Sequence, residues 1–167
     1  MAESGELTLE GPDATEALGA RLARALRPPG ATGLTVYLVG DLGAGKTTLA
    51  RGFLRAMGHE GRVPSPTYTL VEPYDLAGYR VFHIDLYRIR HAAELQDLGL
   101  SDALAGSAVA LIEWPDQGAN QLPPPDVVVH LCVAAGGRVA RCEALTEHGR
   151  TLLRGAFKGI QPGLSGA

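Results

Sequence analysis

A lysine and two threonines follow a run of glycines at a spacing that suits phosphate binding. Residues 40–48 read Gly-Asp-Leu-Gly-Ala-Gly-Lys-Thr-Thr and match G-x-x-x-x-G-K-S/T, the P-loop motif. The glycines let backbone N–H groups turn inward around phosphate oxygens, and the start of a following helix adds partial positive charge. Lys46 can bridge the β- and γ-phosphates, and Thr47 can offer its hydroxyl to Mg²⁺. The stretch therefore predicts a nucleotide site formed by Asp41, Leu42, Gly43, Ala44, Gly45, Lys46, Thr47 and Thr48.

Two carboxylates stand where hydrolysis would need an acidic partner for metal or water. Asp85 follows the apolar run 81–84, and Glu113 follows the run 108–112. In nucleotide-binding α/β folds, ligands gather outside the carboxyl ends of parallel strands. Glu113 ends the more apolar run, so we expect it to hold Mg²⁺ through water, opposite Thr47. Asp85 is then expected to polarise the attacking water or to share the metal shell. The alternative for each acid is a solvated residue at the end of a strand.

A second group of residues has weaker signals. Residues 65–67, Ser-Pro-Thr, follow the P-loop helix, where nucleotide-sensing loops sit, and the Thr67 hydroxyl can contact Mg²⁺ or a γ-phosphate. The alternative is an ordinary turn before a strand. Trp114, the only tryptophan, follows Glu113 and can pack on a ligand, although a partly buried core aromatic is the commoner role. His83 lies two residues before Asp85 on the same strand face, but a lone histidine in a strand is usually structural. Tyr87 and Arg88 can flank the site, and Arg88 can act on phosphate, although an exposed arginine is the default.

These side chains need a strand, a turn and a helix at one edge of a sheet. The β-branched run 35–39 predicts the strand, and apolar residues at helical spacing after Thr48 predict the helix, which Gly58 ends. Asp13 and Glu16 predict a capped start for the preceding helix. Turns at 75–78 and 134–137 predict two antiparallel hairpins beside the parallel part. The expected strands are 6–9, 35–39, 68–74, 79–87, 108–112, 126–133 and 138–145, and the other expected helices are 13–26, 91–98 and 147–157.

Length and composition favour one α/β domain. The 167 residues suit a single unit over 1–157 followed by a flexible tail, 158–167. A net charge of −3 argues against a strongly nucleic-acid-binding surface. We expect a cytoplasmic protein, because no run reaches transmembrane length and the acidic N-terminus lacks the features of a signal peptide. Cys132 and Cys142 have no metal-ligand spacing and are expected to be a buried, reduced pair.

Taken together, four stretches resemble the bacterial TsaE family. They are 40–48, 65–71 (Ser-Pro-Thr-Tyr-Thr-Leu-Val), 83–88 (His-Ile-Asp-Leu-Tyr-Arg) and 112–115 (Ile-Glu-Trp-Pro). The first is a generic motif, whereas the other three together are specific. The resemblance covers roughly residues 7–150. It implies a three-layer α/β/α P-loop NTPase fold with a mixed, mostly parallel central sheet and antiparallel hairpins.

The resemblance also implies an activity and partners. It implies a slow ATPase that uses ATP and Mg²⁺ and works with the proteins TsaB and TsaD. These partners transfer a threonylcarbamoyl group to N6 of adenosine 37 in tRNAs, so contact with tRNA is indirect, and no membrane is involved. Carried over to this chain, Lys46 and Thr47 bind phosphate and Mg²⁺, and Thr67 lies in a switch-like loop. Asp85 and Glu113 serve metal and hydrolysis, with Trp114 beside the nucleotide.

Three other functions fit the same P-loop. A small-molecule kinase needs an acceptor pocket and an arginine-bearing lid, and the sequence shows no clear lid. A GTP-dependent switch usually carries Asn-Lys-x-Asp, which does not occur here. A nucleotide-binding regulatory module would not need the two acids, Asp85 and Glu113.

Overall fold

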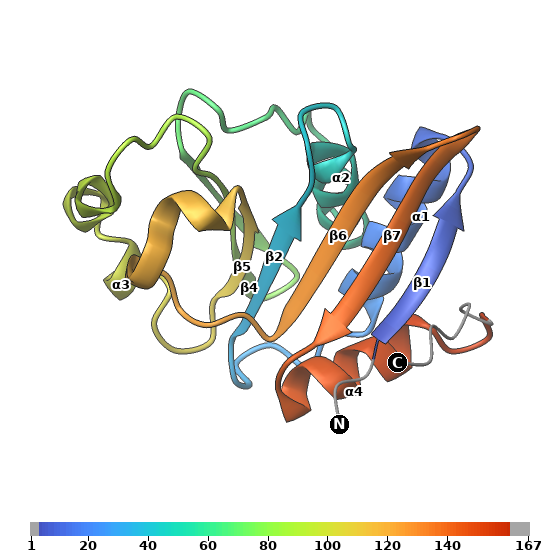
Figure 1. Ribbon diagram of the computed structural model, residues 1–167. Helices are drawn as coiled ribbons and strands as arrows, with labels where there is room; N and C mark the ends of the chain where they lie inside the picture. The colour runs from blue at the N-terminus through green and yellow to red at the C-terminus, as the bar shows by residue number, and fades with distance from the viewer. Residues whose placement is uncertain (1–3, 161–167) are drawn as a thin grey trace.

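A seven-stranded mixed sheet organises the chain (Figure 1). The computed structural model describes residues 4–160. The strands cross the sheet in the order β1-β7-β6-β2-β5-β4-β3. The four strands β6, β2, β5 and β4 are parallel, whereas β3–β4, β6–β7 and β1–β7 are antiparallel pairs. Both predicted hairpins are therefore confirmed. The strands are β1 (Ser4–Leu9), β2 (Leu34–Val39), β3 (Val71–Leu76), β4 (Tyr79–Asp85), β5 (Val109–Glu113), β6 (Val127–Ala134) and β7 (Gly137–Ala144).

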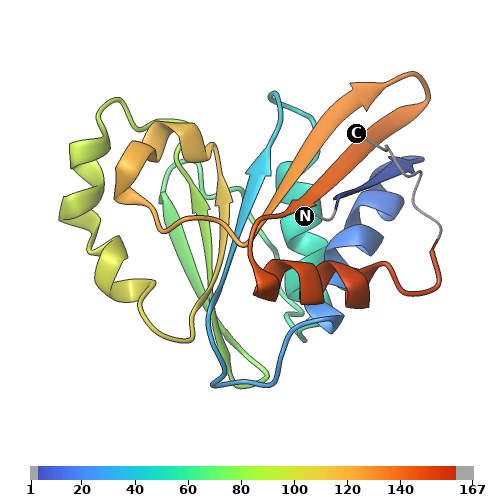
Figure 2. The same cartoon turned by 60° about the horizontal axis from the view of Figure 1, so that its bottom comes forward.

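Helical segments cover both faces of this sheet (Figure 2), which confirms the three-layer α/β/α fold. Alternate residues of a strand point to opposite faces. In β5, Val109 and Leu111 pack in the core on the side of α1, α2 and α4, while Ala110 and Ile112 pack in a second core on the other side. The segments are α1 (Pro12–Arg24), α2 (Lys46–Ala56), α3 (Leu100–Ala103), α4 (Glu147–Ala156) and the 3₁₀ segments η1 (Ala92–Leu98) and η2 (Pro115–Gln121).

The turn between β2 and α2 is shaped by its glycines. A Cβ on Gly40 would lie 2.5 Å from the carbonyl oxygen of Leu131, so only glycine fits beside β6. Gly45, the N-cap of α2, has φ of 111°, a left-handed conformation that glycine adopts at little cost. The chain thus reverses within a few residues. Lys46 and Thr47 consequently stand in the first turn of α2 at the carboxyl edge of the sheet.

The start of α1 differs from the predicted cap. The N-cap is Gly11, Pro12 occupies the first turn, and no side chain caps the helix. Proline suits this place because its fixed φ is already helical and it has no N–H to satisfy. The Glu16 carboxylate instead lies 3.4 Å from Arg51 and 3.3 Å from Arg55, both on α2. The prediction was wrong because tertiary contact with α2 recruits this carboxylate.

Two strand boundaries also move, and one helical segment is of a different type. The strand predicted at 68–74 begins at Val71, because Leu70 donates its N–H to the Pro66 carbonyl at 2.7 Å and has φ of 66°. The strand predicted at 79–87 ends at Asp85, whose carboxylate accepts the N–H of Tyr87. The segment predicted as a helix over 91–98 is the 3₁₀ segment η1. The other predicted elements lie within a few residues of their predicted bounds, whereas α3 and η2 were not predicted.

The prediction of a buried, reduced cysteine pair is partly confirmed. Both cysteines are free thiols, as expected, but only Cys142 is buried, and Cys132 is exposed near the end of the β6–β7 hairpin. Burial raises the pKa of Cys142 to about 12, so this thiol stays protonated at neutral pH.

Within residues 4–160, every helix falls short of the length and hydropathy that a bilayer crossing requires. Residues 161–167 of the predicted tail lie outside the described part.

Candidate functional site

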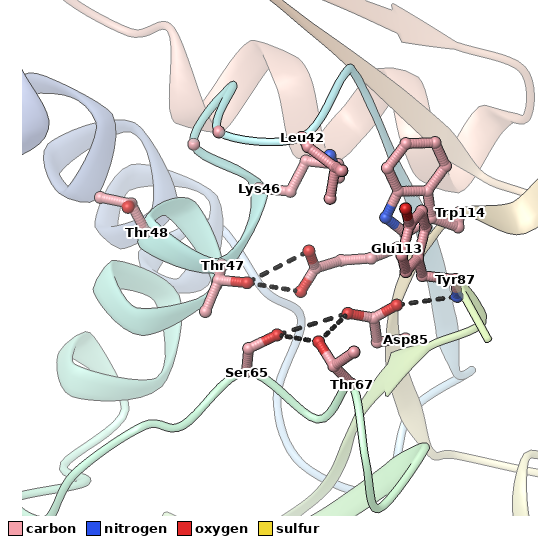
Figure 3. A pocket seen from close by; sticks show the side chains of 12 residues that line it. Leu42, Lys46, Thr47, Thr48, Ser65, Thr67, Asp85, Tyr87, Glu113 and Trp114 are labelled. Carbon is pink, nitrogen blue, oxygen red and sulfur yellow. Dashed lines mark hydrogen bonds between the residues drawn. The ribbon is translucent and has the colours of Figure 1, made fainter.

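The carboxyl ends of β2, β5 and β4 meet the first turn of α2 around a cleft of about 310 Å³ (Figure 3). Most of the predicted site residues line it, and only Asp41 and Ala44 do not. The lining residues are Leu42, Gly43, Gly45, Lys46, Thr47, Thr48, Ser65, Thr67, Asp85, Tyr87, Glu113 and Trp114. Ala44 is buried, and Asp41 contributes its backbone carbonyl instead. The P-loop therefore lies in the same cleft as the residues at the ends of β4 and β5, which are distant from it in sequence.

Lys46 supplies a buried cation to this cleft. Its Nζ donates hydrogen bonds to the carbonyl oxygens of Gly40 at 2.6 Å and Asp41 at 2.9 Å. The same Nζ lies 4.4 Å from the ring centroid of Trp114, a cation–π distance. Burial lowers the pKa of Lys46, and nearby carboxylates, led by Glu113, partly oppose that shift. The ammonium group therefore rests on neutral carbonyls that an anion can replace as its partner.

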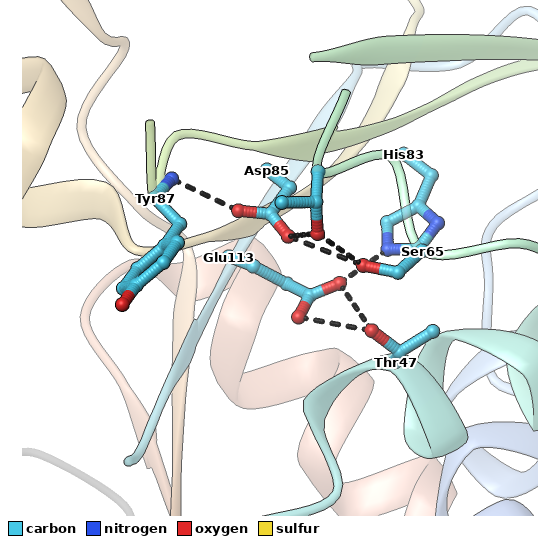
Figure 4. A network of polar contacts seen from close by, with 7 residues as sticks. Thr47, Ser65, His83, Asp85, Tyr87 and Glu113 are labelled. Atoms are coloured by element: carbon cyan, nitrogen blue, oxygen red, sulfur yellow. Dashed lines mark hydrogen bonds and ion pairs between the residues drawn. The ribbon is translucent and has the colours of Figure 1, made fainter. Parts of the chain in front are cut away.

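Glu113 is the centre of a buried polar network (Figure 4). The Thr47 hydroxyl donates to its carboxylate, with Oγ1 at 3.0 Å from Oε2 and 3.2 Å from Oε1. The ring nitrogen Nε2 of His83 lies 2.6 Å from the same Oε2 and donates to it. Both Glu113 and His83 are buried. Asp85 is also buried, and it lies opposite Glu113 in the backbone register of β4 and β5. Neither acid is therefore a solvated residue at the end of a strand.

The donor set suits a hard cation held jointly with a ligand. Thr47 and Glu113 offer oxygen atoms, which Mg²⁺ prefers. Among residues 4–160, no group of three or more His, Cys, Asp or Glu side chains can hold a metal by itself. Mg²⁺ usually binds through one or two protein oxygens together with phosphates and water. The residues present therefore fit Mg²⁺ bound together with a nucleotide.

Asp85 connects the 65–67 loop to the end of β4 (Figure 4). Its Oδ2 accepts from the Thr67 hydroxyl at 3.1 Å and from the Ser65 hydroxyl at 3.4 Å. Its Oδ1 accepts from the backbone N–H of Tyr87 at 2.9 Å. The two loop hydroxyls also lie 2.7 Å apart. The loop is therefore more than an ordinary turn before a strand, because its hydroxyls reach a buried acid in the cleft.

Trp114 forms one wall of the cleft. It has φ of 56° and ψ of 51°, a left-handed conformation that is uncommon for a bulky residue and directs the chain from β5 into η2. Its ring is half-buried and lies 5.0 Å from that of Tyr87, which stands at the exposed rim. Trp114 packs against the second core and also lines the cleft, so packing on a ligand stays a prediction.

His83 and Arg138 contact residues of the site but were not predicted to act in it. His83 had a structural alternative, and its position two residues before Asp85 on the same strand face was the only sequence signal. Arg138 gave no signal, because its partners are about ninety-five positions away in sequence. Its guanidinium donates to the carbonyl oxygens of Gly43 and Ala44, both at 3.1 Å.

Comparison with known proteins now adds to this geometry. Residues 9–140 match the family model of the threonylcarbamoyl adenosine biosynthesis protein TsaE. The chain is 44% identical over 120 residues to the tRNA threonylcarbamoyladenosine biosynthesis protein TsaE of Haemophilus influenzae, covering 72% of this chain and 76% of that protein. It is 39% identical over 112 residues to the protein of the same name from Bacillus subtilis, covering 67% of each.

A solved structure is similar over almost the entire chain. The crystal structure of Bacillus subtilis YdiB superposes with a TM-score of 0.77 at 27% identity, covering 95% of this chain and 97% of that one. The family model spans most of the sequence, including the glycine-rich loop, the 65–67 loop and both buried acids. Fold, site and sequence similarity therefore agree that the chain belongs to the TsaE family of threonylcarbamoyl adenosine biosynthesis proteins.

Proposed function

We propose that this protein is an ATPase that binds ATP with Mg²⁺ and hydrolyses it slowly. In this proposal it acts with TsaB and TsaD and supports turnover of the complex that forms N6-threonylcarbamoyladenosine at position 37 of tRNA. The observation that carries the proposal is the meeting of Lys46 with the Thr47–Glu113 pair in one cleft at the start of α2. Membership of the TsaE family supports the pathway, and the cleft supports the nucleotide.

The glycine-rich loop and the first turn of α2 would bind the phosphates. Lys46 is free to exchange its two carbonyl partners for phosphate oxygens, which would give charge-assisted hydrogen bonds. The backbone N–H groups at the start of α2 have no helical partner and add to the attraction for an anion. Thr47 and Glu113 would hold Mg²⁺, with Glu113 acting through water. Bound Mg²⁺ supplies charge neutralisation at the phosphoryl oxygens.

In this proposal Asp85 serves hydrolysis rather than nucleotide binding. We expect Asp85→Asn to leave the dissociation constant for ATP nearly unchanged and to lower the turnover rate by about a hundredfold or more, the range typical of lost acid–base assistance. The amide keeps a similar shape and one acceptor oxygen but lacks the negative charge. Turnover would be measured with TsaB and TsaD present, and binding by calorimetry. Asp75→Asn, at an exposed place in β3, is the control. Parental turnover in Asp85→Asn would contradict the assignment.

The 65–67 loop is the proposed moving part. Its two hydroxyls hold Asp85 in this structure, and they line the cleft into which a γ-phosphate would project. A ligand shifts a conformational equilibrium only by its different affinity for the two states. ATP and ADP would therefore have to stabilise different arrangements of this loop, of which the partners prefer one. In this account the ATP state docks on TsaB and TsaD, and hydrolysis resets the complex.

Removal of the Thr67 hydroxyl tests this coupling. We expect Thr67→Ala to keep most of the affinity for ATP, because the loop at 40–45 and Lys46 supply it. In the parent, partner affinity should differ between an ATP analogue and ADP by about five- to 150-fold, the range typical of allosteric coupling. In Thr67→Ala this difference should be smaller. Partner affinity would be measured in both nucleotide states, with Thr69→Ala as a neighbouring control. If the parent protein binds its partners equally in both states, the coupling mechanism is wrong.

The products of ATP turnover test the proposed activity. Purified protein, TsaB and TsaD would be incubated with ATP and Mg²⁺, and ADP and free phosphate would be counted. Equal amounts of both support an ATPase. ADP without matching free phosphate, when small-molecule acceptors are present, would favour the alternative of a P-loop kinase. Absence of ADP in every combination would contradict both.

A further inference from the structure

Arg138, at the start of β7, holds the back of the glycine-rich loop. Its Nε donates to the carbonyl oxygen of Ala44 and its Nη2 to that of Gly43, both at 3.1 Å. Its Nη1 donates to the carbonyl oxygen of Gly137 at 2.9 Å. Each of the three guanidinium nitrogens therefore has a carbonyl acceptor, and the side chain is half-buried in this position.

The carbonyl groups of Gly43 and Ala44 belong to a loop whose N–H groups would face a bound phosphate. A loop that turns its N–H groups toward an anion turns the adjoining carbonyl groups outward, and outward carbonyls need donors. Gly43 has φ of 80° and Gly45 has φ of 111°, so the backbone reverses on both sides of Ala44. Arginine suits the task because its planar fork offers several donors in fixed directions, which lysine cannot match.

The backbone that carries Arg138 is fixed from both sides. In the sheet it pairs with Leu9 of β1 and with Val133 of β6. The preceding residue, Gly137, approaches β1 so closely that a Cβ there would lie 2.1 Å from the Leu9 carbonyl oxygen. In Figure 1 the turn between β6 and β7 lies at the same end of the sheet as the loop that enters α2. A rigid strand thus presents the guanidinium to the loop.

We propose that Arg138 is a positioning residue that holds the glycine-rich loop in its phosphate-binding shape before a nucleotide arrives. The inference rests on the proposed nucleotide binding, and it assigns to the C-terminal hairpin a part in that binding. Because Arg138 also lines a smaller cavity of about 120 Å³ with Gly43, Gly45 and Thr48, the rival is direct contact with the base or ribose. A positioning role predicts that loss of Arg138 weakens binding of a ligand that has phosphates only. Direct contact with the base or ribose predicts no such loss.

Calorimetric titration with two probes separates these roles. Arg138→Ala, Arg138→Lys and the parent would be titrated with ATP and with inorganic tripolyphosphate, both with Mg²⁺. We expect Arg138→Ala to weaken both probes by the same factor, roughly tenfold, as for loss of about one charge-assisted hydrogen bond. Arg138→Lys keeps the charge without the fork and should recover only part of the loss. Arg141→Ala, which removes an exposed arginine from the same strand, should bind like the parent.

Chemical rescue distinguishes positioning of the loop from general support of the fold. Millimolar methylguanidinium should restore ATP affinity in Arg138→Ala and leave Arg141→Ala unchanged. No rescue, combined with a large fall in the free energy of unfolding, would overturn the proposal in favour of a purely structural role. Unchanged affinity for both probes in Arg138→Ala would also overturn it, as would a loss confined to ATP.

The parent titration keeps this inference distinguishable from the proposed function. If the parent binds tripolyphosphate but not ATP, the proposed ATP binding is wrong. The role of Arg138 would then be tested by the tripolyphosphate affinities of the variants. A parent that binds neither probe would overturn both.

Discussion

Replacement of Lys46 by alanine is expected to weaken ATP binding by about ten- to a hundredfold. A hydrogen bond from a charged donor contributes on the order of 1.5–3 kcal/mol, and each 1.4 kcal/mol is about a factor of ten. The ammonium group is already in the cleft, where it rests on two neutral carbonyls. Exchange of these carbonyls for a charged phosphate strengthens its hydrogen bonds. Alanine loses that gain and leaves the surrounding acids, Glu113 and Asp85, to repel the nucleotide.

The chain provides a matched control for this substitution. It contains two lysines, and the second, Lys158, is exposed after the end of α4. Lys158→Ala removes the same charge, so it corrects for any long-range effect of net charge on ATP binding. Calorimetry should show the loss in Lys46→Ala only. Equal ATP affinity in Lys46→Ala and the parent would refute the assignment of Lys46.

Substitution of Glu113 is expected to act on the metal rather than on the nucleotide. Glu113→Gln should reduce the gain in ATP affinity that Mg²⁺ confers by about ten- to a hundredfold, the range observed when groups that support a metal are changed. Affinity without Mg²⁺ should change little. Glutamine is preferred to alanine, because His83 would otherwise lose its acceptor in a buried place, at a cost of about 1–3 kcal/mol.

The measurement is ATP affinity with and without Mg²⁺ in three proteins. They are the parent, Glu113→Gln and Glu60→Gln, in which an exposed glutamate is changed. A Mg²⁺ effect that survives intact in Glu113→Gln would contradict the metal assignment. If Asp85→Asn removes the Mg²⁺ effect instead, the two acids have exchanged roles, and the site itself stands.

Local patterns were sufficient to predict the unit that forms the cleft. The β-branched run of β2, the glycine spacing and the apolar face of α2 act over short distances, so the sequence states them directly. The acids followed from a general rule of parallel sheets, since Asp85 and Glu113 both end apolar runs. Their pairing across β4 and β5 is what that rule requires. Resemblance to a family then added the layer architecture.

Contacts between distant segments could not be predicted in the same way. Glu16 was expected to complete a capping pair with Asp13 at the start of its own helix, but its carboxylate pairs with Arg51 and Arg55 of α2, and no side chain caps α1. Arg138 contacts a loop about ninety-five residues earlier, and only the strand order brings the two together. The left-handed Leu70 shortened a strand whose composition alone favoured extension. Contacts between distant segments decided the first two cases, whereas a local turn from Pro66 to Leu70 decided the third.

A crystal structure with a non-hydrolysable ATP analogue and Mg²⁺ tests the central claim most directly. The account predicts the triphosphate in the cleft of Figure 3, with Mg²⁺ beside Thr47 on the side of Glu113. Lys46 should have left the carbonyl oxygens of Gly40 and Asp41 for the phosphates. An analogue bound elsewhere on the protein, or Lys46 still donating to these two carbonyls with the nucleotide in place, would contradict it.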